Sequence, residues 1–459
     1  MGGSAPRMLD GIMDRHAMIC IFLALFILTW CGVGNAAIVC LLGLLLCAEG
    51  MIQPSAQADL WFLLPLAAYE LANILSTLAA YGGIGGGYAA TQAIFPVLYL
   101  LMACLSRRDL ALLKEACAAW AGLTASASLL SYAFTAAAHG GSARSGGILG
   151  NPNAMGIFLV VGWFALLHAD AQGGPDRPRR TALLLRLEPL LLAALALTLS
   201  MGSFAAMAAG VLWLAASQRR RAPPWEALRY TCRLLARAAL GMGSGVLLLL
   251  AASRTDAPWL ALPVLACILA LAACWPRFLR FLEDLPVMAG LLAAAGLLVA
   301  AAAVFLRPSS LATFAERLEM MASAAGYLAA RPLTGVGPYR WRLLDLADGG
   351  TYFNTWHIHN ALLHVGVELG LPAMALLAGT AARGLQKPRS APERAGFFAF
   401  FVHNLMDTSF FYTGVTALAL LTSGEPHSGG RKLGGLPLKL FFGASAAVFA
   451  CGLYEALRG

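Results

Sequence analysis

The chain has 459 residues and a formal charge of +9, and it is 59% hydrophobic and only 12% charged. A soluble globular domain carries about 25% charged residues, so this composition and a mean hydropathy of +0.73 exclude a water-soluble protein. The apolar segments are long and unbroken, as in AGLLAAAGLLVAAAAVFL at residues 289–306, which excludes the alternating strands of a membrane β-barrel. We therefore predict an all-α polytopic membrane protein.

Apolar segments recur from residue 17 to residue 455. Since a helix needs about 20 apolar residues to cross a bilayer, they predict roughly 12 to 15 transmembrane helices in a single domain covering the whole chain. The first two segments, which follow Arg15 and Asn35, predict a retained helical hairpin rather than a cleaved signal peptide. The cysteines lie in or beside apolar segments without CxxC spacing, which predicts apolar packing rather than a disulfide framework or a metal knuckle.

Basic residues gather in short loops that recur after every second apolar segment. This distribution follows the positive-inside rule and predicts a multi-pass protein of the inner (cytoplasmic) membrane with a cytoplasmic N-terminus. The longest connection, at about residues 307–358, is then extracytoplasmic. The basic positions are Arg107, Arg108, Arg177, Arg179, Arg180, Arg219, Arg220, Arg221, Arg277, Arg280, Arg383, Lys387, Arg389, Arg394, Arg431 and Lys432.

The long connection contains a predicted helix and a predicted turn. FAERLEMMASAAGYLAA has apolar residues at helical spacing, which predicts a helix lying along the outer surface. The proline and glycine residues of ARPLTGVGPYRW should end that helix and turn the chain back toward the membrane. The next helix is predicted to begin near His359 and to run inward.

Three histidines and a glutamate stand around the start of that inward helix, and three interpretations are open. On one continuous helix His357, His364 and Glu368 would share a face and could bind a metal ion. Alternatively, His359 and Asn360 stand at the helix start and face an aqueous cavity, where a neutral imidazole can take a proton from a hydroxyl. In the third interpretation the histidines are only polar residues at a helix end.

Four arginines in the long connection oppose the positive-inside bias, and an anionic ligand outside the membrane would explain them. Guanidinium groups bind phosphate oxygens in a bidentate manner, so a lipid diphosphate is a suitable ligand. Alternatively, these arginines pair with lipid headgroups or with acids of the same connection. The arginines are Arg317, Arg331, Arg340 and Arg342, and the acids are Glu316, Glu319, Asp345 and Asp348, the two aspartates being expected in solvent.

The order of these motifs resembles that of the O-antigen ligase and O-antigen polymerase superfamily of membrane glycosyltransferases. The resemblance includes an outer arginine, Arg317, a P-x-x-G-x-G-P turn at residues 332–338, and His359-Asn360 with nine residues before Gly370. It extends to GILGNPNAMGIFL, with Asn153 at the head of a helix, and to VHNLMDTSFF, with His403 and Asp407.

The resemblance implies a metal-independent, cofactor-free, inverting glycosyltransferase with a C-type fold. Its donor would be a glycan on undecaprenyl diphosphate and its acceptor a hydroxyl of a glycan, lipid or protein; nucleic acid is not an expected partner. By resemblance, Arg317 stabilises the leaving diphosphate and His359 orients or deprotonates the acceptor hydroxyl. The substrate-binding residues would be Arg340, Asn360, Asp407 and Asn153.

The sequence departs from the family pattern at two positions. Phe204 follows Ser203 where the family has an arginine, and Ala373 stands where ligases have Gly, Thr or Tyr. The sequence therefore leaves both a polymerase and a ligase as possible interpretations. Two further alternatives are a flippase or exporter of lipid-linked oligosaccharide, which should carry its arginines at the bilayer midplane, and a non-catalytic scaffold.

Overall fold

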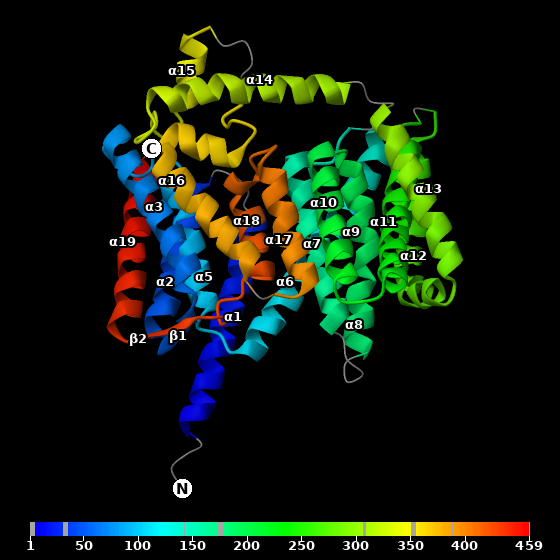
Figure 1. Ribbon diagram of the computed structural model, residues 1–459, viewed down its shortest axis with the longest axis horizontal. Helices are drawn as coiled ribbons and strands as arrows, with labels where there is room; N and C mark the ends of the chain where they lie inside the picture. Colours follow the sequence, from blue (N-terminus) through cyan, green and yellow to red (C-terminus); the bar gives the residue numbers. More distant parts are fainter. Residues whose placement is uncertain are drawn as a thin grey trace. The chain divides into compact units, whose positions relative to one another are not determined.

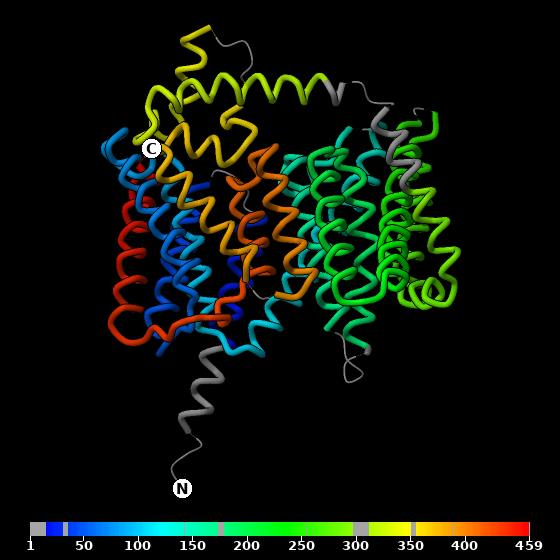
Figure 2. The backbone as a smooth tube through the Cα atoms, in the orientation of Figure 1, coloured from blue at the N-terminus to red at the C-terminus, as the bar shows by residue number. Residues whose placement is uncertain are grey.

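The computed structural model describes residues 5–30, 35–141, 143–172, 178–254, 256–305, 309–349, 355–387 and 389–458 (Figures 1 and 2). Two compact units are distinguished. Unit 1 comprises residues 1–114, 314–389 and 404–459, and unit 2 comprises residues 115–313 and 390–403. Arg177, Arg307 and residues 350–354 of the predicted loops lie outside the described residues.

Unit 1 is built mainly from helices of three separate stretches of the chain. Its helices α2 and α19 pack closely because Gly43 and Gly50, seven residues apart on α2, receive the rings of Phe449 and Phe442 from α19. Its elements are α1 (Ala5–Trp30), α2 (Ala36–Ile52), β1 (Ser55–Ala58), α3 (Leu60–Tyr81), α4 (Ala89–Gln92), α5 (Ile94–Met102), the start of α6 (Arg107–His139), most of α14 (Ser309–Ala330), α15 (Trp341–Ala347), α16 (Ala361–Gln386), η3 (Ser409–Phe411), α18 (Thr413–Ser423), β2 (Arg431–Gly434) and α19 (Leu436–Arg458).

All regular secondary structure in the described part of unit 2 is helical. A buried ionic group lies inside this unit. The carboxylate of Glu188 is fully buried and accepts hydrogen bonds from Trp163 (2.9 Å), Trp275 (2.8 Å) and Arg237 (2.8 Å). We call these four residues the Glu188 cluster. The elements are the rest of α6, η1 (Gly147–Leu149), α7 (Pro152–Gln172), α8 (Pro178–Leu185), α9 (Leu187–Thr198), α10 (Met201–Arg219), α11 (Pro224–Ala252), η2 (Pro258–Leu260), α12 (Ala261–Asp284), α13 (Pro286–Phe305) and α17 (Ala391–Asn404).

The predicted all-α membrane class is confirmed. Nine helices in the described part are long and apolar enough to cross a membrane, and five shorter helices are also apolar. The sequence did not predict one addition, a two-stranded antiparallel sheet in which Ser55 faces Gly434 and Ala58 faces Arg431. The nine described cysteines are free thiols, and Cys31 lies outside the described residues.

Helix α14 contains the predicted FAERLEMMASAAGYLAA helix, which is therefore confirmed as a helix. Figure 1 shows α14 running crosswise over one end of α3 and α16. Its place on the outer membrane surface stays a prediction.

Helix α16 is bent at Gly370, whose φ of +88° and ψ of 168° lie outside the helical region. Only glycine adopts this conformation readily, and Pro372 two residues later has no N–H to donate. The bend therefore leaves the carbonyl groups of the preceding turn, including those of Val367 and Glu368, in need of other donors.

The turn at residues 332–338 supplies these donors. Val336 N–H donates to the Val367 carbonyl (2.9 Å), and Gly337 N–H donates to the Glu368 carbonyl (2.9 Å). Gly335 has a φ of +65°, and a Cβ on it would collide with the backbone of Glu368. The P-x-x-G-x-G-P motif thus docks by backbone contact onto the bent helix, which fixes the chain on both sides of the candidate site.

Candidate active site

The N-terminus of α16 positions His359. Asn360 caps the helix, because its extended backbone (φ −159°) lets the side-chain oxygen accept the N–H of Leu363 at 2.9 Å. One turn later the fully buried His364 accepts the N–H of Ile358 at 3.3 Å. His359 is held between these two anchors, and the predicted helix start near His359 is confirmed.

Asp407 comes from the polar segment between α17 and η3. The side-chain oxygen of Asn404 accepts the N–H of Phe410 at 2.7 Å and closes this segment into a tight loop. Within the loop, Asp407 accepts the N–H of Thr408 at 2.8 Å and is 5% exposed. The carboxylate is therefore fixed by its own backbone.

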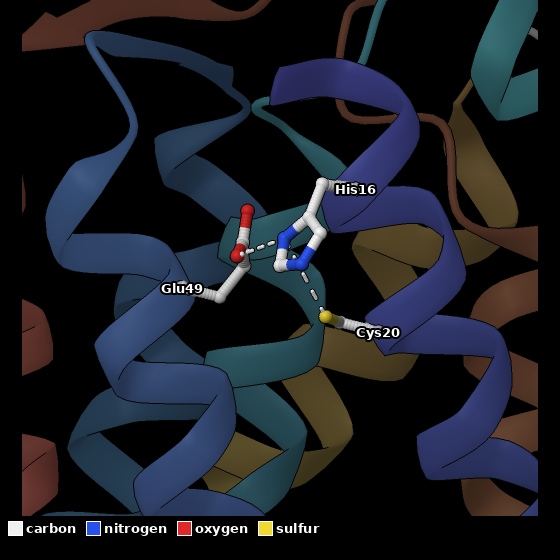
Figure 3. A group of neighbouring side chains, drawn as sticks. All are labelled: His16, Cys20 and Glu49. Atoms are coloured by element: carbon white, nitrogen blue, oxygen red, sulfur yellow. Dashed lines mark hydrogen bonds and ion pairs between the residues drawn. The ribbon is translucent and has the colours of Figure 1, made fainter. Parts of the chain in front are cut away.

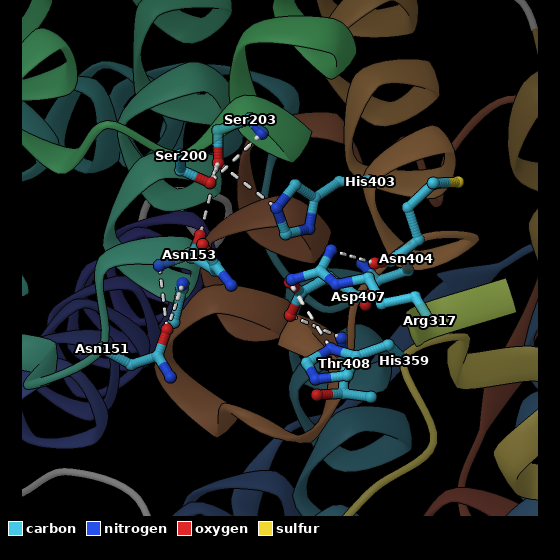
Figure 4. Close-up of polar contacts among 12 residues, drawn as sticks. Asn151, Asn153, Ser200, Ser203, Arg317, His359, His403, Asn404, Asp407 and Thr408 are labelled. Carbon is cyan, nitrogen blue, oxygen red and sulfur yellow. Dashed lines mark hydrogen bonds and ion pairs between the residues drawn. The ribbon is translucent and has the colours of Figure 1, made fainter. Parts of the chain in front are cut away.

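Arg317 of α14, Asp407 and His359 form one group, all in unit 1 (Figure 4). Arg317 donates through Nη1 to the Met406 carbonyl at 2.7 Å and through Nη2 to Asp407 Oδ2 at 3.3 Å. Nδ1 of His359 lies 3.8 Å from the same Oδ2. We call these three residues the Arg-Asp-His group. The carboxylate contacts both the guanidinium and the imidazole and can orient both.

Two nitrogen atoms of this group have no hydrogen-bond partner although they are buried. They are Nε of Arg317 and Nδ1 of His359. Buried polar atoms are almost always paired, so unpaired ones in a cluster of functional side chains point to a substrate. Burial lowers the pKa of His359 and Arg317 adds to this effect, while Asp407 opposes it. The imidazole is therefore neutral near neutral pH and can accept a proton.

Arg340 lies at the end of α3 instead of within the group. It donates to the Ala80 carbonyl at 2.7 Å, and its guanidinium lies 5.5 Å from the centre of the Tyr81 ring. In the part of the chain that the structure describes, it forms no ion pair with Asp407. Its predicted role as a second phosphate contact stays a prediction.

The expectation that Asp345 is in solvent is wrong. Asp345 is 2% exposed and accepts a hydrogen bond from Ser323 of α14 at 3.4 Å, and burial raises its pKa. It therefore helps to attach α15 to α14. Asp348 is exposed as expected and accepts a hydrogen bond from Tyr327 at 2.5 Å.

A second polar cluster belongs to unit 2 and contains Asn153. Arg144 donates to the Asn153 side-chain oxygen at 2.8 Å and to the Thr198 carbonyl at 2.9 Å. Ser203 Oγ lies 3.2 Å from Nε2 of His403 and donates to the Asn153 carbonyl at 3.4 Å. The sequence did not single out Arg144, although it lies nine residues before Asn153 in the same loop.

The head of α7 is built as the Asn-Pro-Asn motif predicts (Figure 4). Asn151 accepts the N–H groups of Asn153 (2.8 Å) and Ala154 (3.1 Å), and Pro152 occupies the first helical position, where no N–H is needed. Phe204 lies in α10 next to Ser203 and brings no positive charge. In unit 2 the cation beside Asn153 is Arg144 instead.

The three residues considered as a possible metal site, His357, His364 and Glu368, do not lie on one helix face, because α16 begins only at Ala361. His357 precedes α16 and stacks on Phe411 at 4.4 Å between ring centres. Its ring nevertheless lies 4.9 Å from that of His364, whose Nε2 lies 3.3 Å from Glu368. His364 also accepts the N–H of Ile358, so we expect it to be needed for the fold around His359. Its role is to support the position of His359.

One described group of side chains has three candidate ligand atoms within 4.8 Å of one another, namely His16, Cys20 and Glu49 (Figure 3). Glu49 already faces His16 at 2.6 Å and accepts a hydrogen bond from Gln53 at 2.6 Å. These contacts account for the buried carboxylate, and the group joins α1 to α2.

Comparison with known proteins gives a match to a family model. No curated protein matches the chain. A family model described as O-antigen ligase matches residues 239–378, a segment that holds Arg317, the 332–338 turn, His359 and Gly370. This region is therefore similar to the O-antigen ligase family, which supports the resemblance to the O-antigen ligase and polymerase superfamily that the sequence motifs indicated.

Proposed function

We propose that the protein transfers a glycan from a polyprenyl diphosphate, such as undecaprenyl diphosphate, to an acceptor hydroxyl. The observation that carries this proposal is the Arg-Asp-His group, in which the Arg317 Nε is buried without a hydrogen-bond partner and the His359 Nδ1 is in contact only with Asp407 Oδ2, at 3.8 Å, among the described residues. The guanidinium Nε suits a phosphate oxygen. Because Nδ1 of His359 faces Asp407 Oδ2, the other ring nitrogen, Nε2, is the one that can take a hydroxyl proton. The family match supports a lipid-linked glycan as substrate and a membrane setting.

In the proposed step the acceptor oxygen forms a bond to the anomeric carbon as the bond from that carbon to the diphosphate oxygen breaks. His359 takes the proton of the acceptor hydroxyl, and the diphosphate leaves with the electron pair of the broken bond. Arg317 stabilises the negative charge that develops on the leaving group. A single displacement of this kind inverts the anomeric centre and needs no metal ion.

Asp407 supports both partners in this proposal. Its carboxylate orients the Arg317 fork and opposes the loss of basicity that burial imposes on His359. The side-chain oxygen of Asn360 accepts the capping hydrogen bond at the start of α16. The side-chain amide nitrogen is left to donate hydrogen bonds to the sugar. Arg340, at the end of α3, is proposed as a phosphate contact. For Asn153, which belongs to unit 2, a role in substrate binding stays a prediction.

We also propose that residues 307–358 lie on the extracytoplasmic side of the membrane, because the basic loops are expected on the cytoplasmic side. Ser323 of α14 is exposed, so Ser323→Cys offers a thiol to test it. An impermeant thiol reagent should label this variant on intact cells above the level of the parent protein, whose own cysteines supply the background. Labelling of Ser323→Cys only after lysis would place the segment in the cytoplasm.

The donor contact is tested by Arg317→Lys, assayed with purified protein and a glycan on undecaprenyl diphosphate. Lysine keeps the charge but loses the planar fork, so we expect turnover to fall by about 100-fold while the amount of folded protein is kept. Arg331→Lys is the matched control, because Arg331 is exposed just beyond α14 and should tolerate lysine. Wild-type turnover in Arg317→Lys would remove Arg317 from the site.

A further inference from the structure

A pocket in unit 1 lies beside the β1–β2 ribbon, at the end opposite α14 (Figure 1). Its volume is about 520 Å³, within the roughly 300–1,000 Å³ of small-molecule sites. Gln57 of β1 holds the walls together, since its N–H donates to the Ala103 carbonyl at 2.7 Å and its side chain donates to the His427 carbonyl at 3.4 Å. The Arg-Asp-His group contributes nothing to this pocket.

The charged residues among the described lining residues are basic. Arg107, at the first position of α6, and Lys432 of β2 line the pocket with exposed side chains. In the described part of unit 1 neither forms an ion pair. The nearby acids are already engaged, since Asp109 accepts a hydrogen bond from Ser106 at 2.6 Å and Glu425 pairs with Lys114 at 3.3 Å.

A buried side chain in the same wall lacks a partner. His427 lines the pocket and is 8% exposed, and its Nε2 atom has no hydrogen-bond partner. An imidazole nitrogen in this situation needs a ligand that can exchange a hydrogen bond or a proton with it. The polar groups of the wall therefore indicate an anionic ligand that also carries or accepts a proton.

The start of α6 adds a second type of donor. Ser106 caps this helix of 33 residues, since its hydroxyl accepts the N–H of Asp109 at 3.2 Å. The first turn of a helix presents N–H groups without intrahelical partners and favours anions. Arginine, lysine, imidazole and helix N–H groups together are the donors that bind phosphate.

We propose that this pocket binds a phosphate group through Arg107, Lys432, His427 and the first turn of α6. A phospholipid headgroup and a soluble phosphate share this chemistry. The site is separate from the proposed transfer reaction and would be a point where lipid or phosphate stabilises unit 1.

The test measures thermal unfolding of the full-length protein in detergent. Inorganic phosphate is titrated against chloride at equal ionic strength, and dioctanoyl phosphatidylglycerol is titrated separately. A ligand that binds only the folded state raises the unfolding temperature progressively as its concentration exceeds its Kd. We expect Arg107→Gln and Lys432→Gln each to weaken this binding about tenfold, which corresponds to about 1.4 kcal/mol.

The matched controls are Arg108→Gln and Arg431→Gln. These residues are exposed neighbours of Arg107 and Lys432 in the chain, but they do not line the pocket. Binding of inorganic phosphate that depends on Arg107 and Lys432 would support a soluble phosphate, and binding of the lipid alone would support a headgroup. The proposal is overturned if neither probe binds, or if the control variants lose as much affinity as the pocket variants.

Discussion

Glu188 in unit 2 and Asp407 in unit 1 are both buried carboxylates paired with an arginine, but their surroundings differ. Glu188 accepts hydrogen bonds from two tryptophans and from Arg237, and Arg237 also pairs with Asp170 at 3.2 Å. Asp407 pairs with Arg317 at 3.3 Å and lies 3.8 Å from His359 Nδ1, yet Arg317 Nε and His359 Nδ1 have no hydrogen-bond partner among the described residues.

The difference separates a structural ionic group from a candidate active site. The donors around Glu188 satisfy its charge within the fold, so little remains for a ligand. Arg237 of α11 is engaged by two acids, Glu188 and Asp170. In the Arg-Asp-His group, by contrast, a guanidinium and an imidazole retain binding capacity next to each other.

The largest effect on stability is expected from removing the arginine of the Glu188 cluster. Arg237→Gln leaves a fully buried carboxylate without its cation, which costs about 3–5 kcal/mol in buried pairs. The unfolding midpoint in detergent should fall accordingly, while transfer per folded molecule is retained. Arg233→Gln is the control, because Arg233 and Glu283 form a partly exposed pair at 3.8 Å that should contribute at most about 1 kcal/mol.

Equal midpoints for Arg237→Gln and Arg233→Gln would show that the Glu188 cluster does not stabilise unit 2. A loss of transfer without a loss of stability in Arg237→Gln would contradict the distinction between the two carboxylates.

A smaller effect is expected on the pH dependence of transfer. His359 must be neutral to accept a proton, and its pKa lies below the usual 6.5, so the acid limb of kcat/KM should lie below pH 6.5. Asp407 raises this pKa, and Asp407→Asn removes that influence. The acid limb should therefore move to still lower pH, together with a lower maximal rate.

The exposed Asp348 provides the control for this shift, and Asp348→Asn should leave the acid limb in place. Movement of the limb to higher pH in Asp407→Asn would mean that a group other than His359 titrates.

The helical class, the helix start near His359 and the turn at residues 332–338 could be predicted because they depend on local composition, spacing and turn chemistry. The contacts that assemble the site could not, since they join distant parts of the chain. Nothing near Gly370 in the sequence indicates that Val336 and Gly337 donate to the carbonyls before it. The burial of Asp345 depends likewise on its contact with α14.

The ribbon of β1 and β2 was missed for a similar reason. Each strand has only four residues, too few for an alternating pattern, and they pair across more than 370 positions of the chain. Such long-range pairing leaves little local signal in either segment.

The central claim, that His359 handles the acceptor proton within a site whose donor contact is Arg317, is tested most directly by His359→Ala. Transfer and donor binding are measured on the same purified protein, with His357→Ala as the neighbouring control. We expect His359→Ala to lose transfer by about 100-fold to 10,000-fold, the usual contribution of a general base, while it binds the lipid diphosphate donor as tightly as wild type. Substantial transfer by His359→Ala, or an equal loss in His357→Ala, would contradict the assignment.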